Sequence, residues 1–72
     1  MADAATVLHR EVLELLLEKV ENDPYPSGTM MDMIEQMLRP EDVASYAEIL
    51  LDKLRADRFP SIDMLRRVIA LQ

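Results

Sequence analysis

The chain has 72 residues, no cysteine, one histidine and a formal net charge of −6 at pH 7. This length predicts a single domain, residues 1–72, with a small core. The lack of cysteine excludes disulfides and thiolate metal sites, and it fits a cytoplasmic protein. The acidic balance repels phosphate backbones, so we expect no nucleic-acid partner. No apolar run approaches the roughly 20 residues of a membrane span, and no basic segment followed by an apolar run marks a signal peptide.

The first predicted helix runs from about Ala4 to Asn22. Asp3 or Thr6 can cap its start by accepting a hydrogen bond from an N–H group of the first turn. Its apolar residues recur at the three- and four-residue spacings of an amphipathic helix: Val7, Leu8, Val12, Leu13, Leu16, Leu17 and Val20. Its other side carries an acidic stripe, Glu11, Glu14, Glu18 and Glu21.

Two prolines then end this helix, because proline lacks an N–H group and forces the preceding residue out of the helical region. The break is Asn22-Asp23-Pro24-Tyr25-Pro26. Ser27 or Thr29 can cap the second predicted helix, which runs to about Leu38. One side of this helix is apolar, with Met30, Met31, Ile34 and Met37.

The third predicted helix opens at Arg39-Pro40-Glu41-Asp42 and runs to about Ala56. Proline suits the first helical position, and acidic side chains there favour the positive end of the helix dipole. Its apolar side holds Val43, Tyr46, Ala47, Leu50, Leu51 and Leu54. A second break follows, and Ser61 caps a fourth helix, which continues to the end of the chain with Met64, Leu65, Val68 and Leu71 on one side.

An internal repeat relates the two halves. Tyr25-Pro26-Ser27 returns as Phe59-Pro60-Ser61, and 59 − 25 gives an offset of 34 residues. When residues 15–37 are aligned with 49–71 without a gap, seven of the 23 pairs are identical. We therefore predict an all-α fold of four short helices in two pseudo-repeated helix-turn-helix hairpins, about 4–38 and 40–72. Packed on their common faces, the hairpins form a compact bundle, either a closed pseudo-twofold bundle or an open superhelical stack.

The two corners are interpreted as structural. Tyr25 and Phe59 can pack like hydrophobic staples at the starts of the helices that follow, beside Pro26, Ser27, Pro60 and Ser61. Either serine could instead be a nucleophile or a modification site, but a nucleophilic serine needs a base within hydrogen-bond reach. The only histidine is His9, and no glycine-rich elbow surrounds either serine. We expect no catalytic residue, no cofactor and no enzyme activity. An enzyme would need a cofactor or an active site shared between chains.

The charged residues predict no metal site, because His9 has no second histidine and metal sites need ligands that converge from several elements. We expect His9 to be a partly buried residue on the apolar side of its helix, with a pH-responsive group at an interface as the alternative. The acidic charge is concentrated in residues 1–38, which hold two basic and eight acidic residues against six of each in 39–72. The first half is therefore the one expected to face any basic partner.

Some apolar residues have no apolar counterpart in the repeat, so the shared fold does not require them. These are the predicted interface residues Val7, Leu8, Met33, Leu38 and Ile69. Exposed apolar clusters usually mark partner sites. The leading hypothesis is a small, acidic, non-enzymatic protein-interaction module that forms a homodimer or joins a larger assembly. The alternative is an inhibitor or antitoxin-like protein that offers Glu11, Glu14, Glu18 and Glu21 to a basic partner.

Overall fold

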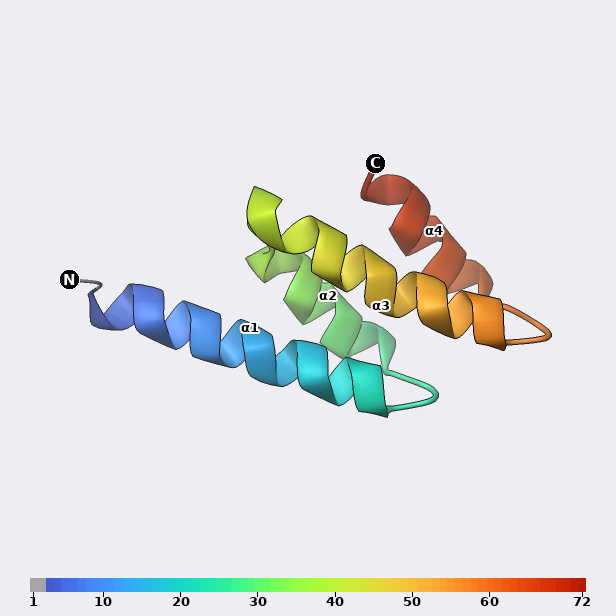
Figure 1. Ribbon diagram of the computed structural model, residues 1–72, viewed down its shortest axis with the longest axis horizontal. Helices are drawn as coiled ribbons and strands as arrows, with labels where there is room; N and C mark the ends of the chain where they lie inside the picture. Colours follow the sequence, from blue (N-terminus) through green and yellow to red (C-terminus); the bar gives the residue numbers. More distant parts are fainter. Residues whose placement is uncertain (1–2) are drawn as a thin grey trace. The chain divides into compact units, whose positions relative to one another are not determined.

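The computed structural model describes residues 3–72, so the first two residues of the predicted 1–72 domain lie outside the described part. Within residues 3–72, four α-helices follow one another: α1 (Ala4–Asn22), α2 (Gly28–Met37), α3 (Val43–Ala56) and α4 (Ile62–Ala70). A 3-10 turn, η1 (Pro40–Asp42), precedes α3 (Figure 1). Residues 3–72 contain no strand, which confirms the predicted all-α class with four helices.

The chain divides into two compact units, an N-terminal unit that ends at Leu38 and a C-terminal unit that begins at Arg39. Within the first unit α1 contacts α2, and within the second α3 contacts η1 and α4. Each unit is therefore a helical hairpin in its own right. The 34-residue repeat between the two hairpins stays a prediction.

The N-terminal unit is held by apolar side chains spaced to face one side of each helix. The buried residues of α1 are Leu13, Leu16 and Val20, at spacings of three and four, and those of α2 are Met31 and Ile34. Burying a side chain of this size contributes about 2 kcal/mol. Asp3 caps α1, because the Thr6 N–H donates to Asp3 Oδ1 at 2.8 Å.

The two helices of this unit differ in length, and the difference leaves part of α1 unpaired. With 19 residues against 10 and a rise of about 1.5 Å per residue, α1 is longer than α2 by about 13 Å. Because α2 runs back from the C-terminal end of α1, the first turns of α1 extend beyond it (Figure 1). No residue of α1 before Leu13 is buried.

The C-terminal unit buries Tyr46 and Leu50 from α3 and Met64 from α4. Its first turn differs from the predicted continuous helix, since Pro40–Asp42 is 3-10 and the α-helix begins at Val43. In that turn the Asp42 N–H donates to the Arg39 carbonyl oxygen at 2.8 Å, and the Arg39 N–H donates to Asp42 Oδ2 at 3.2 Å. These two bonds close a three-residue turn before the α-helical pattern starts.

Two helix ends fall slightly short of the predicted ones. Leu38 is the C-cap of α2, with an extended backbone at φ −62° and ψ 131°, so the helix ends at Met37. The next residue, Arg39, precedes Pro40 and is extended too, as proline demands of its neighbour. The fourth helix ends at Ala70 in a tightened last turn, in which the Leu71 N–H donates to the Val68 carbonyl oxygen at 3.1 Å and the Gln72 N–H donates to the Ile69 carbonyl oxygen at 3.3 Å.

Candidate functional site

The two corners share one pattern of hydrogen bonds. Asp23 Oδ1 accepts the Tyr25 N–H at 2.9 Å, and Asp57 Oδ1 accepts the Phe59 N–H at 3.1 Å. Each aspartate is also the C-cap of the helix before its corner. These Asx turns give the freed backbone groups partners while the chain reverses direction.

Both corner serines act as helix caps. Ser27 Oγ accepts the Met30 N–H at 3.1 Å, and Ser61 Oγ accepts the Met64 N–H at 3.2 Å. Thr29, the other candidate cap for the second helix, lies inside α2 instead. Each serine oxygen therefore serves to start a helix, which is the role expected if the corners are structural.

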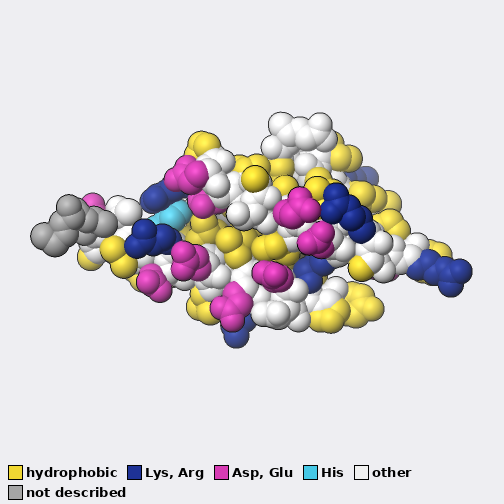
Figure 2. Space-filling model, viewed as in Figure 1, with side chains coloured by type: hydrophobic (Ala, Val, Ile, Leu, Met, Phe, Trp, Pro, Cys, Tyr) yellow, Lys and Arg dark blue, Asp and Glu magenta, His cyan; other side chains and the backbone are white. Residues whose placement is uncertain are grey.

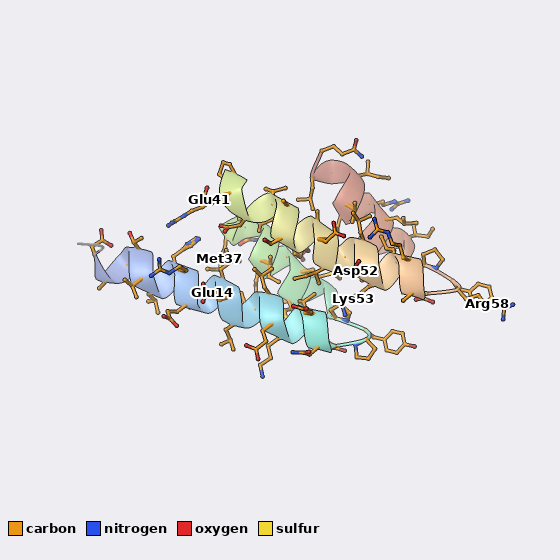
Figure 3. The ribbon with its side chains drawn as sticks, in the orientation of Figure 1. Glu14, Met37, Glu41, Asp52, Lys53 and Arg58 are labelled. Carbon is orange, nitrogen blue, oxygen red and sulfur yellow. The ribbon has the colours of Figure 1, made fainter. Side chains whose placement is uncertain are left out.

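The packing predicted for the corner aromatic residues is wrong. Tyr25 is 86% exposed and Phe59 is 83% exposed. A hydrophobic staple uses the residue directly before the N-cap, and with Ser27 and Ser61 as N-caps that position holds Pro26 and Pro60. The aromatic rings therefore stand one residue too early to pack on the next helix. Arg58 likewise projects outward from the tip of the α3–α4 corner (Figure 3).

His9 continues the buried row of α1, since it stands four residues before Leu13. It is half-buried, as expected for a residue at the edge of the apolar side. Its Nε2 atom is fully covered and has no hydrogen-bond partner among the described residues. A buried polar atom without a partner lowers stability.

Four of the five predicted interface residues are exposed. Val7 and Leu8 lie on the part of α1 that extends beyond α2, and Met33 and Ile69 lie on α2 and α4. Leu38, at the C-cap of α2, is half-buried. Val7, Leu8, Met33 and Leu38 therefore belong to the N-terminal unit and Ile69 to the C-terminal one. The exposure of the other four makes them available to a partner, and the interface itself stays a prediction.

The acidic stripe of the first helix lies on the solvent side of α1. All four of its members, Glu11, Glu14, Glu18 and Glu21, are exposed, and Glu14 is marked midway along the helix in Figure 3. Figure 2 shows acidic side chains on the surface beside hydrophobic ones. A stripe of this kind can attract a basic surface over a distance of about 10 Å at ordinary salt.

Sequence reasoning did not single out two further exposed apolar residues, Leu15 on α1 and Ile62 on α4. Leu15 is paired in the repeat with the apolar Ile49, so the repeat gives no sign of its exposure. The helical spacing offers a better signal. Leu15 stands seven residues after Leu8, and Ile62 stands seven residues before Ile69, so each shares one side of its helix with a predicted interface residue.

Among residues 3–72, no group of three or more histidine, cysteine, aspartate or glutamate side chains is arranged to hold a metal ion. Within the same range, no helix has the length and apolar character needed to cross a bilayer. No protein-family model, curated protein or solved structure matches the chain. The exposed side chains are therefore the features of the molecule that bear on its function.

Proposed function

We propose that this chain is a small, acidic, non-enzymatic helical module that binds another protein chain, either by self-association or as a subunit of a larger assembly. One observation carries the proposal. Among the described residues, eight large apolar side chains are buried and eight more are exposed. A core this small buries only as many large apolar side chains as the described residues leave exposed, which favours a partner that covers the remainder.

The proposed partner is a protein and not a nucleic acid. The net charge of −6 opposes phosphate backbones, whereas apolar side chains at helical spacing suit a helix or groove of another protein. We also propose a cytoplasmic location, because a chain without cysteine suits a reducing compartment.

The test is retention of a partner by the tagged chain in extracts of its native host, compared between two variants of α2. Met33→Glu places a charge at an exposed apolar position, and Gln36→Glu places the same charge at an exposed polar position of the same helix. The proposal expects Met33→Glu to lose a partner that Gln36→Glu retains. Equal retention by both variants would contradict it.

A second function is supported by the acidic stripe, whose four members are all exposed on α1. In this alternative the module is an inhibitor or antitoxin-like protein, and the stripe covers a basic partner surface. Replacing the four glutamates by glutamine keeps their size and removes their charge. The alternative expects this variant to lose the partner and expects binding by the unmodified chain to weaken steeply with salt. Binding that is indifferent to salt would contradict it.

A further inference from the structure

Two helices of this chain carry exposed apolar pairs with the same spacing. On α1, Leu8 is 63% exposed and Leu15 is 52% exposed, and on α4 both Ile62 and Ile69 are 62% exposed. Seven residues separate the members of each pair, so they lie two helical turns apart on one side. In both helices this side is turned away from the buried residues, Leu13 and Leu16 on α1 and Met64 on α4.

Each pair encloses two further side chains, at the third and fourth positions after its first member. This defines the α1 face as Leu8, Glu11, Val12 and Leu15, and the α4 face as Ile62, Leu65, Arg66 and Ile69. Both faces have an apolar residue at each end, but they differ in the order of the charged and apolar residues between the ends. The α1 face has its acidic residue at the third position and an apolar one at the fourth, whereas the α4 face has an apolar residue at the third and a basic one at the fourth.

Helix handedness makes these two arrangements complementary. Seen from outside, the third and fourth positions stand on opposite sides of the line that joins the ends of the face. When two parallel helices lie face to face, the left side of one meets the right side of the other. The third position of each helix then lies opposite the fourth position of its partner. Glu11 would face Arg66, and Val12 would face Leu65.

The antiparallel orientation lacks this match. If one helix is reversed, Glu11 would lie opposite Leu65, and Val12 opposite Arg66. Both charges would then lose water against an apolar neighbour, which is unfavourable. The charged and apolar residues of the α1 face and the α4 face therefore match only when the two helices run in parallel.

We infer that the partner of this module is a second copy of the same chain, and that the α1 face of one copy packs in parallel on the α4 face of the other. This inference rests on the proposed function and identifies the partner and both surfaces. The uneven distribution of charge is compatible with it, because residues 1–38 hold two basic and eight acidic residues while 39–72 hold six of each. In this pairing an acidic half meets a half without net charge, so the repulsion between two acidic halves is avoided.

The contact joins two different surfaces, and each copy carries both an α1 face and an α4 face. Such a contact closes into a reciprocal dimer or a ring, or it continues as a chain of copies. A single helix pair buries less than the roughly 1,000 Å² expected of a stable interface, so each contact should be weak and association should depend on concentration.

The test uses one variant of each face, followed by sedimentation velocity on each variant and on their mixture. Leu8→Asp with Leu15→Asp blocks the α1 face, and Ile62→Asp with Ile69→Asp blocks the α4 face. Because all four positions are exposed, circular dichroism should show unchanged helix content. Each variant alone is expected to weaken self-association by at least about tenfold. Their equimolar mixture is expected to form a one-to-one complex, because each variant supplies the face that the other lacks.

A charge exchange provides a second measurement that alters no apolar residue. Glu11→Arg and Arg66→Glu are each expected to weaken self-association by at least about threefold, because like charges then face each other. The chain that carries both substitutions is expected to return to within about twofold of the unmodified chain. Absence of this rescue would overturn the parallel pairing.

The remaining outcomes separate the inference from the proposed function. If either face variant alone associates as strongly as the unmodified chain, the pairing of α1 with α4 is wrong, although self-association survives. If the mixture forms no complex, the pairing is also wrong. If the unmodified chain is a monomer at every concentration, the second copy is not the partner. The comparison of Met33→Glu with Gln36→Glu then decides the proposed function independently.

Discussion

At the scale of single residues, the helix starts depend on side-chain oxygen atoms. Ser27 and Ser61 each accept one N–H that would otherwise lack an intrahelical partner. We predict that Ser27→Ala and Ser61→Ala each lower the free energy of unfolding by about 1 kcal/mol. Urea denaturation followed by circular dichroism measures this change. Thr29→Ala is the matched control, since Thr29 lies in α2 and caps nothing, and an equal loss in the control would contradict the assignment.

Asp3 gives the cap of α1 a pH dependence. Its pKa lies below its usual value of 3.8, first because its carboxylate accepts the backbone N–H of Thr6 and also because of a hydrogen bond from the Thr6 side chain. A lowered pKa means that the cap stabilises fully above pH 3.8 and is lost as the pH falls through the folded-state pKa.

This dependence can be isolated with a variant that keeps the cap. Asp3→Asn retains an oxygen acceptor but cannot titrate. We predict that the stability of the unmodified chain falls more steeply below pH 4 than that of Asp3→Asn, in urea melts at a series of acidic pH values. Identical slopes for the two chains would show that the Asp3 hydrogen bond does not form in solution.

Exposure distinguishes the corner aromatic residues from the core. Because Phe59 is 83% exposed, Phe59→Ala should change the free energy of unfolding by less than about 0.5 kcal/mol. Leu50 is fully buried, and Leu50→Ala should lower it by about 3 kcal/mol. Chemical denaturation of the two variants provides the comparison. A large loss in the free energy of unfolding for Phe59→Ala would show that Phe59 packs on the following helix after all.

At the scale of elements, α1 combines a packed part and an unpacked part. Its buried residues begin at Leu13, and its first turns extend beyond the end of α2. Helical backbone without buried apolar contacts opens more readily than packed helix. We predict faster amide hydrogen exchange at residues 8–11 than at 16–20, measured by NMR. Equal protection in a monomeric sample would contradict the division of α1. Added protection of 8–11 at high concentration is expected if the α1 face becomes covered.

Local chemistry explains which features of the elements could be predicted from the sequence. The bounds of the first helix, Ala4–Asn22, and the serine caps depend on neighbouring residues only, and the structure agrees with both. The packing expected for Tyr25 and Phe59 is wrong although the caps are right, because the serine caps place the prolines, and not the aromatic residues, at the position that a hydrophobic staple uses. The exposure of Leu15 and Ile62 depends on which side of each helix its hairpin partner covers. That is a tertiary property. The internal repeat gives no sign of it for Leu15, which is paired with Ile49, whereas Ile62 is paired with Gly28 and so has no apolar counterpart.

At the scale of the whole molecule, we propose that apolar side chains outside the core serve a protein partner. Because a second copy of the chain is the inferred partner, association can be measured with one component. Apolar contacts supply most of each proposed interface, with Glu11 and Arg66 as its charged pair, so association should depend strongly on concentration and only modestly on salt. The alternative function through the acidic stripe predicts strong salt dependence instead.

Sedimentation equilibrium of the unmodified chain, from low to high micromolar concentration at low and high salt, tests this claim most directly. We predict that the average mass rises from that of one chain toward that of two or more, with a midpoint that moves little with salt. A mass of one chain at every concentration and at both salt levels would contradict self-association.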